Sequence, residues 1–249
     1  MERDSDLGRQ NKIAFPEFDA ISGNRIMYYS SKRIIDVIVS IIALIIFSPS
    51  MLIVAALIHF DSPGPVIFTQ KRVGAKRIKK AGHYCWEKTE FPCYKFRTMV
   101  DKADPSIHNQ FITALINHDE QKITAIQGSD TEVKKIVKDP RVTRWGHFLR
   151  RSSLDELPQF WNVLRGEMSV VGPRPAILYE LESYKPWYFQ RLEAKPGITG
   201  LWQVRARNSV DFDDMVKLDI EYVRKQSFWL DMKIIFMTPL VMLKHKGVA

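Results

Sequence analysis

The apolar residues of this chain are distributed very unevenly along its length. Residues 1–30 are polar and irregular, which predicts a flexible N-terminal tail. Between residues 34 and 60 almost every position is apolar, so any helix formed there is apolar on all of its faces. Such a helix is long enough to cover a bilayer core about 30 Å thick. We therefore expect a membrane segment over residues 31–60.

The sequence Ser48-Pro49-Ser50 interrupts this segment near its middle. Proline removes a backbone donor and predicts a kink, while the serines can bond back to the carbonyls that the kink frees. Each arm is too short to span a bilayer, and basic residues flank both ends. We predict a re-entrant helical hairpin kinked at Ser48 and Pro49, with both ends on the cytoplasmic side; a single kinked crossing stays open. Asp36 is expected to pair with Lys32.

Residues 61–249 form the folded part, which begins at the turn sequence DSPGP. Short strands are expected over residues 66–74, 93–99 and 168–171, a helix over residues 154–168, and partial helix over residues 101–140. The apolar segment 228–246 is expected either to lie in the membrane interface or to pack on the core. The pattern predicts a membrane-associated α/β protein with short strands and interfacial helices.

The charge balance points to an anionic partner. The chain has 37 basic and 28 acidic residues, a formal net charge of +9. Such an excess suits nucleic acid, anionic lipid or a phosphorylated substrate. Nucleic acid is not expected, because basic residues interleaved with stacking aromatics are sparse and a membrane anchor would be unusual for such a protein. The two cysteines, Cys85 and Cys93, are expected to be free thiols.

The strongest local candidate for chemistry is the sequence RRSSLDELP. Ser153 and Glu156 have the spacing of a capping box, which predicts that a helix begins here, with Pro158 in its first turn. Asp155 would then lie in the positive field of the helix start, beside Arg151 and the arginine before it, and its pKa would be lowered. An ionised carboxylate in such a place can attack phosphorus or hold Mg²⁺. A purely helix-stabilising role for the two acids stays open at this point.

Three other positions carry charge that suits phosphate. Arg174 lies between two prolines that fix its backbone. A guanidinium held in this way suits bidentate phosphate binding. The same sequence is equally typical of a rigid turn whose arginine faces solvent. Lys95 and Arg97 are two residues apart on an expected strand and would face the same side.

Taken together, these motifs resemble a known family. The sequences KRIID, DSPGPVIFTQKRVG, YKFRTM, DPRVTRWGHFLRRSSLDELPQFWNVLRGEMSVVGPRP and KPGITGLWQV occur in the order found in bacterial sugar transferases, the monotopic polyprenyl-phosphate phosphoglycosyl transferases. The resemblance runs from about Lys32 to the C-terminus. Residues 111–137 look like an insertion, and residues 1–30 have no counterpart, so the resemblance leaves the sugar specificity open.

The resemblance implies a specific reaction and site. A nucleotide diphosphate-sugar, expected to be a UDP-sugar, would give its sugar-1-phosphate to polyprenyl (undecaprenyl) phosphate in the first step of surface glycan assembly. The phosphosugar would be held covalently on Asp155, with Glu156 as the second acid and both carboxylates on Mg²⁺. We expect Arg174, Lys95, Arg97 and Arg151 to bind substrate phosphate.

The same resemblance implies a re-entrant helix and a catalytic part on the cytoplasmic face of the bacterial inner membrane. A homo-oligomer stays open. Two rival functions also stay open: a membrane-bound phosphatase or nucleotidase that uses the same aspartate, and a non-catalytic scaffold for glycan assembly.

Overall fold

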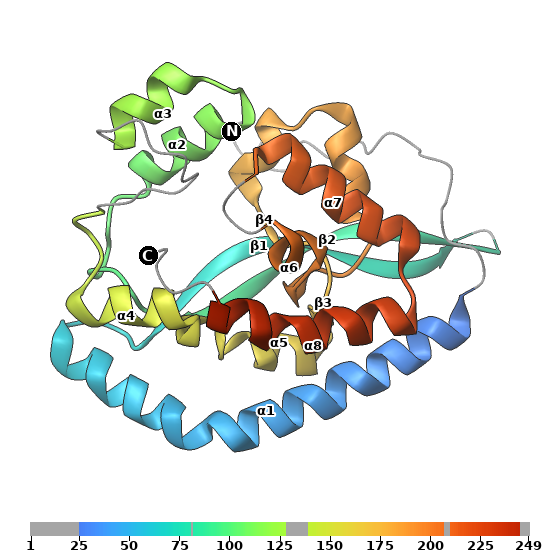
Figure 1. The fold of residues 1–249 in the computed structure, drawn as a ribbon, viewed down its shortest axis with the longest axis horizontal. Coiled ribbons are helices and arrows are strands. Elements are labelled where there is room, and N and C mark those ends of the chain that lie inside the picture. The colour runs from blue at the N-terminus through green and yellow to red at the C-terminus, as the bar shows by residue number, and fades with distance from the viewer. Residues whose placement is uncertain (1–24, 81, 128–138, 207–209, 245–249) are drawn as a thin grey trace, which may run out of the picture.

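The computed structural model describes residues 25–80, 82–127, 139–206 and 210–244, and in these residues helices surround a long β-hairpin (Figure 1). The predicted α/β class is confirmed. Most of the predicted tail lies outside the described residues, but the first helix, α1 (Ile26–Asp61), already begins within the range assigned to the tail.

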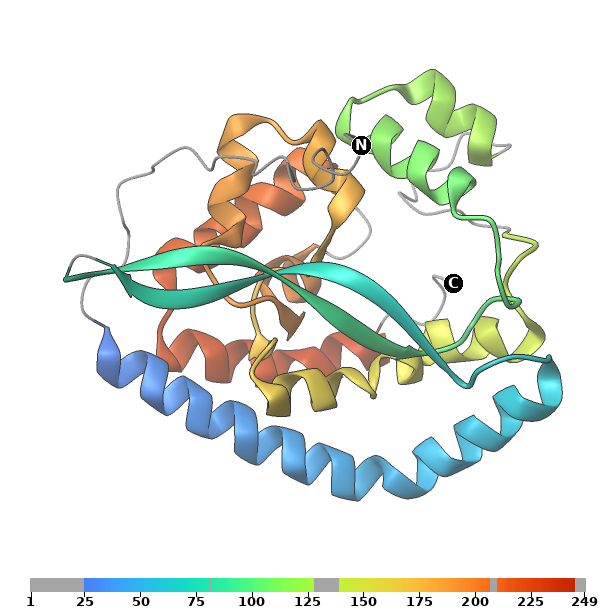
Figure 2. The same ribbon diagram turned by 180° about the vertical axis from the view of Figure 1, so that it is seen from behind.

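α1 is one continuous helix of 36 residues with Pro49 inside it. Ser48 donates to the carbonyl of Ile45 and Ser50 to that of Phe47, both at 2.8 Å, as expected for serines beside a proline kink. Figures 1 and 2 show that the bent helix runs along one side of the molecule and that both of its ends turn toward the folded part. α1 is long and apolar enough to cross or insert into a membrane, and only 17% of its most apolar 18-residue stretch is buried.

The first turns of α1 are attached to the folded part through buried polar contacts. Lys32 pairs with Asp231 at 2.9 Å and also donates to the Tyr222 hydroxyl at 3.0 Å. Asp36 accepts from the Ser169 hydroxyl and a neighbouring backbone N–H instead of pairing with Lys32. The expected pairing of Lys32 with Asp36 was therefore wrong, because each side chain finds a partner on an element that packs against α1.

The strands are longer than predicted. β1 (Ile67–Lys80) and β2 (His83–Phe96) pair antiparallel over 14 residues each. β4 (Ala176–Ile177) pairs with β1 at Arg72 and Val73, and β3 (Ser169–Val171) pairs in parallel with β5 (Gly197–Thr199). The predicted buried strand over residues 168–171 is confirmed by β3.

The far half of the hairpin packs against the start of α1. The Arg77 guanidinium lies 4.2 Å from the centre of the Tyr29 ring and 3.9 Å from that of Tyr84. Trp86, opposite Arg77 across the hairpin, contacts Tyr29 edge to face. One hairpin therefore links the start of α1 to the middle of the folded part.

The remaining elements are helices and 3₁₀ turns. In chain order they are α2 (Ser106–Ile116), α3 (Glu120–Gln127), α4 (Arg144–Ser152), η1 (Leu154–Glu156), α5 (Gln159–Arg165), η2 (Leu178–Ser183), η3 (Pro186–Leu192), α6 (Leu201–Arg205), α7 (Phe212–Lys225) and α8 (Phe228–Lys244).

Two buried clusters form the centre of the fold. One gathers residues of β4, η2, η3 and α7 around Tyr188 and Val216. The other joins α5, β3 and α8 around Val163, Met168 and Ile234. Apolar contact between these elements is the main force that holds them together.

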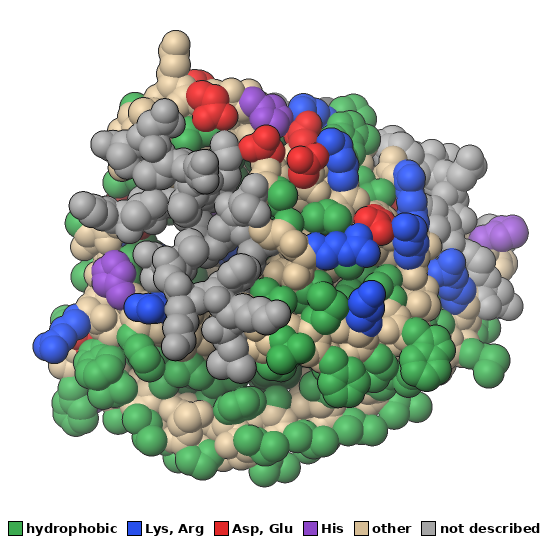
Figure 3. All heavy atoms as spheres, viewed as in Figure 1, with side chains coloured by type: hydrophobic (Ala, Val, Ile, Leu, Met, Phe, Trp, Pro, Cys, Tyr) green, Lys and Arg blue, Asp and Glu red, His purple; other side chains and the backbone are tan. Residues whose placement is uncertain are grey.

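α8 packs on the core with one face and exposes apolar side chains on another. It buries Ile234 in the core, whereas Trp229 is 80% exposed and Phe236 73% exposed. Figure 3 shows hydrophobic side chains gathered along the side of the molecule where α1 and α8 lie. Among them are Ile45, Ile46, Leu52, Trp229 and Phe236. An exposed apolar surface of this extent is typical of a protein that contacts a membrane or a partner.

The segment expected to be an insertion is helical where the structure describes it. α2 and α3 pack on each other through a small cluster of Phe111, Ala114 and Ile123. Residues 128–138 lie outside the described part of the chain. α2 also reaches the main core, where Ile116 is buried with Tyr188.

Candidate active site

The chain turns sharply between α4 and α5, and this turn presents Asp155. α4 ends at Ser153, whose φ of 57° is left-handed and whose N–H bonds back to the carbonyls of Arg150 and Leu149. The single 3₁₀ turn η1 follows, and Pro158 caps α5. The predicted capping box was wrong: Ser153 precedes η1, but its side chain makes no cap hydrogen bond there, and α5 begins only after Pro158.

The turn is set by apolar packing. Leu149 and Leu157 are buried on either side of it against Ile58 of α1 and Phe96 of β2. The left-handed backbone of Ser153 ends α4 between the two leucines, and their shared cluster holds both sides of the turn in place.

Asp155 is buried, at 9% exposed. Burial and the neighbouring Glu156 raise the pKa of Asp155 to about 6, against the lowering effect of Lys95 and Arg150. The predicted lowering was wrong, because loss of water and a second carboxylate outweigh the two cations. With a pKa of about 6, the carboxylate is still mostly ionised at neutral pH.

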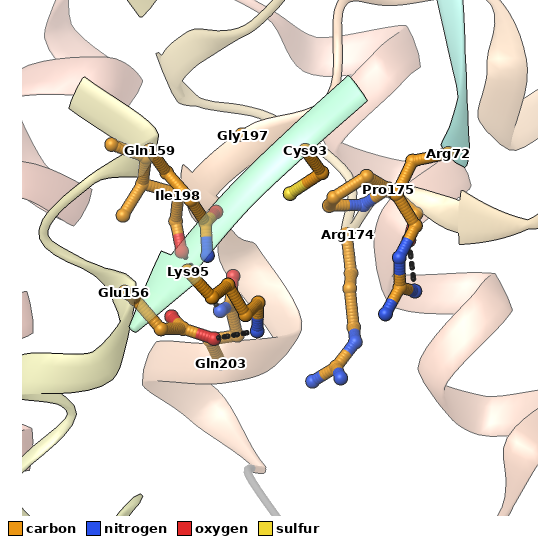
Figure 4. Close-up of a pocket in the computed structure, with 10 residues that line it drawn as sticks. All are labelled: Arg72, Cys93, Lys95, Glu156, Gln159, Arg174, Pro175, Gly197, Ile198 and Gln203. Atoms are coloured by element: carbon orange, nitrogen blue, oxygen red, sulfur yellow. Dashed lines mark hydrogen bonds and ion pairs between the residues drawn. The ribbon is translucent and has the colours of Figure 1, made fainter. Parts of the chain in front are cut away.

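A pocket lined by Glu156, the residue after Asp155, brings cations from three separate parts of the chain together (Figure 4). Lys95, near the end of β2, pairs with Glu156 at 2.7 Å. Arg174 comes from the loop before β4, and Arg72 from the middle of β1. Three cations around one carboxylate form a site for an anion with several negative oxygens.

Arg72 is a site residue that the sequence reading missed, since it was counted only among the basic residues that follow the membrane segment. Its side chain is 8% exposed and donates to the Pro175 carbonyl at 3.1 Å and to Gln70 at 2.8 Å. Burial and Arg174 lower the pKa of Arg72. Its buried Nε has no partner among the described residues. The signal that could have found it was an arginine within an expected strand, directly before the apolar Val73.

A buried arginine fixes the backbone of the loop that carries Arg174. Arg191 is fully buried and donates to the backbone carbonyl of Arg174 at 3.3 Å. The same guanidinium binds Asp219 at 2.6 Å and the Tyr184 hydroxyl at 2.9 Å. The Arg174 side chain itself is exposed to solvent and lines the pocket. A fixed backbone with a free guanidinium is the arrangement that its two flanking prolines suggested.

The structure does not bring Arg97 or Arg151 to this pocket. Arg97 is 4% exposed and donates to the carbonyls of Pro63 and Ser62, at 2.7 and 2.5 Å, just beyond the end of α1. Arg151 is exposed on the last turn of α4. The neighbouring Arg150 is the arginine that acts on Asp155, and its Nε donates to Thr98 at 3.0 Å.

Asp155 and Glu156 are the residues here that could hold a divalent cation. The described residues contain no cluster of three or more histidine, cysteine or acidic side chains. Mg²⁺ commonly takes one or two carboxylates and completes its shell with water and substrate phosphate. Two adjacent carboxylates beside an anion pocket fit that mode of binding. Cys93 also lines the pocket, but burial raises the pKa of its thiol and keeps it neutral.

Comparison with known proteins gives a consistent result. The family model described as bacterial sugar transferase matches residues 27–245. The galactosyl transferase CpsE of Streptococcus agalactiae is 38% identical over 97% of this chain and 49% of its own length. The exopolysaccharide production protein ExoY of Rhizobium meliloti is 39% identical over 84% of this chain and 83% of its own.

A third relative is the UDP-glucose:undecaprenyl-phosphate glucose-1-phosphate transferase of Escherichia coli, 37% identical over 83% of this chain and 39% of its own length. The chain therefore spans about half or less of two of these relatives and most of the third.

The positions of Arg97 and Arg174 predict that the same substitution affects stability at one residue and ligand binding at the other. Arg97→Met should lower the free energy of unfolding by about 2–4 kcal/mol, because buried carbonyls at the end of α1 lose their donors. Arg174→Met should change it by less than about 0.5 kcal/mol, since the side chain is exposed, but should weaken pyrophosphate binding about tenfold. Denaturant unfolding and calorimetric titration in detergent measure both. A stable Arg97→Met protein with weakened pyrophosphate binding would instead place Arg97 at the substrate.

Proposed function

Because this chain belongs to the bacterial sugar transferase family, we propose that it transfers a sugar-1-phosphate from a nucleotide diphosphate-sugar to polyprenyl phosphate in a membrane. The name of the E. coli relative states such a transfer from UDP-glucose to undecaprenyl phosphate, so a UDP-sugar is the donor that we propose. The observation that carries the proposal is a mostly ionised Asp155 next to a pocket with three cations. The product would begin a surface glycan, in line with the exopolysaccharide role named for ExoY.

In the first step, a carboxylate oxygen of Asp155 attacks the phosphorus that bears the sugar. The bond between this phosphorus and the bridging oxygen breaks, and the nucleoside monophosphate leaves with that oxygen. Lys95 and Arg174 lie where their charges can offset the negative charge of the phosphoryl oxygens. The burial that raises the pKa of Asp155 also leaves its carboxylate less hydrated and so a better nucleophile.

In the second step, an oxygen of the lipid phosphate attacks the same phosphorus and displaces Asp155. The products are polyprenyl-diphosphate-sugar and the free carboxylate. Glu156 lies beside Asp155 and pairs with Lys95, so it holds the lysine at the reacting phosphate in both steps. Water in place of the lipid would make the protein a phosphatase, and exclusion of water from the buried Asp155 favours transfer.

Asp155 and Glu156 would hold Mg²⁺ together with the donor diphosphate. The cation would supply positive charge for the leaving nucleoside monophosphate. Without it, two carboxylates would face a diphosphate of like charge.

We also propose that α1 is re-entrant and that the folded part lies at the cytoplasmic face of the bacterial inner membrane. Support comes from the bent path of α1, which has Pro49 inside it, and from the return of both helix ends to the folded part. The exposed apolar side chains of α8 lie on the same side of the molecule as α1. This placement would bring a water-soluble donor and a lipid-bound acceptor to the same pocket.

The two-step reaction predicts that sugar label remains on the protein when lipid is absent. Incubation with labelled UDP-sugar should trap label and release about one UMP per active site. Asp155→Asn should abolish both and lower turnover by about 1,000-fold or more, because an amide is a poor nucleophile. Glu156→Gln should lower turnover about 100-fold without unfolding the protein. Release of UDP, steady hydrolysis without lipid, or full turnover by Asp155→Asn would contradict the proposal.

A divalent cation requirement follows from the paired carboxylates. Excess EDTA should abolish UMP release, and added Mg²⁺ or Mn²⁺ should restore it. Glu156→Gln should need a higher Mg²⁺ concentration for half-maximal rate, because one ligand is lost. Undiminished turnover in EDTA would show that the cations of the pocket suffice.

The re-entrant path predicts that both ends of α1 lie on one side of the membrane. In a Cys85→Ser, Cys93→Ser background, Ser5→Cys and the exposed Lys217→Cys should both resist an impermeant thiol reagent in intact cells whose outer membrane has been opened. Both should react once the inner membrane is made permeable. Labelling of Ser5→Cys alone from outside would show a single crossing. Replacing Ser48, Pro49 and Ser50 with leucine should shift part of the population to that state.

A further inference from the structure

α2 carries a histidine that is bonded to a tyrosine, and the charges of Arg72 and Arg174 act on both side chains, although neither side chain lines the pocket itself. His108 Nδ1 lies 2.6 Å from the hydroxyl of Tyr179, and the two rings meet edge to face. Tyr179 is the second residue of η2, which follows β4 directly. β4 pairs with β1 at Arg72, whose partner is Ile177. Tyr179 follows Ile177 by two residues in the sequence.

His108 and Tyr179 are neutral polar groups in a strongly basic surrounding. Burial, Arg72 and Arg174 lower the pKa of His108 to about 4. Burial raises the pKa of Tyr179 to about 12. A neutral imidazole and a phenol can donate and accept hydrogen bonds and can offer ring faces, which suits an uncharged ring of a ligand better than a phosphate.

Two buried polar atoms on nearby residues have no partner among the described residues: Nε of Arg72 and Oδ1 of Asn109, the residue after His108 on α2. Buried polar groups are nearly always hydrogen-bonded, so such atoms point to a ligand or ordered water beside them.

The layout of the pocket indicates which part of the donor lies near the pair. Figure 4 shows Glu156 and Lys95 on one side of the pocket and Arg174 and Arg72 on the other. Asp155 is adjacent to Glu156, and in a displacement at phosphorus the leaving oxygen departs roughly opposite the attacking one. The leaving nucleoside monophosphate would therefore be directed toward Arg72 and Arg174, and its nucleoside toward the residues beyond them.

We propose that His108 and Tyr179 bind the nucleoside of the donor, so that the start of α2, just before the expected insertion, forms one wall of the nucleotide site. The inference rests on the proposed transfer from a nucleotide-sugar. It also fits how α2 is anchored: Ile116, at its far end, is buried in the core, while His108, near its start, is bonded to Tyr179 of η2.

The test is nucleotide binding in the full-length Asp155→Asn protein, which does not turn the donor over. By calorimetric titration, His108→Ala and Tyr179→Phe should each weaken UMP binding about tenfold, the loss expected for one hydrogen bond in a buried site. Pyrophosphate, which lacks the nucleoside, should bind within about twofold of the parent. The matched control is His118→Ala, which lies just after α2 and contacts Asp213 away from the pocket; it should change neither affinity. Unaltered thermal unfolding of all variants keeps the comparison valid.

Three outcomes would overturn the inference. Unchanged UMP affinity would remove the pair from the nucleotide site. An equal loss of pyrophosphate binding would show that the pair only orders Arg72 and Arg174. A changed preference among UDP-sugars with unchanged UMP affinity would place the pair at the sugar. If the substitutions weaken UMP binding but the trapping experiment releases no UMP, the proposed reaction is refuted and this inference is not.

Discussion

Lys32 makes the contact on which the placement of every other element depends. From the second turn of α1 its ammonium donates to Asp231 of α8, to Tyr222 of α7 and to the carbonyl of Val171 in β3. A charge buried in this way is stable only with all of its partners in place, so the contact fixes the helix against the folded part in one position. Because β3 runs into the loop that carries Arg174, the depth of the pocket relative to α1 is set by the same interaction.

The pocket itself resolves a conflict between like charges. Burial and the neighbouring Glu156 raise the pKa of Asp155. On the other side, burial and the like charge of Arg174 lower the pKa of Arg72. Lys95 joins the two groups through its ion pair with Glu156. An anion bound between the acids and the arginines would relieve the repulsion between Arg72 and Arg174. A cation bound with that anion would relieve the repulsion between Asp155 and Glu156.

The sequence predicted the features that depend on local pattern. The apolar run, the buried strand β3 and the grouping of Lys95 and Arg174 beside the acid pair all agree with the structure. Features that depend on tertiary packing were missed. The spacing from Ser153 to Glu156 predicts a helix start, but Ser153 adopts a left-handed backbone that ends α4, which the local pattern does not reveal. Arg97 follows the last residue of β2, so strand alternation no longer governs its direction. Arg72 lies at the site because the fold brings the middle of β1 beside β4 and the Arg174 loop, which no local pattern reveals.

The β-hairpin has a consequence for how such a protein can vary. β1 contributes Arg72 to the pocket and, five residues later, inserts Arg77 between the aromatic rings of Tyr29 and Tyr84 at the start of α1. At about 3.3 Å per residue, this stretch of strand sets a distance of roughly 17 Å between the pocket and the start of α1. Loss or gain of one residue within it would turn every following side chain to the opposite face. The segment from Arg72 to Arg77 can therefore tolerate substitutions but not changes of length. Natural variation in the length of the hairpin should concentrate at its tip, beyond Lys80.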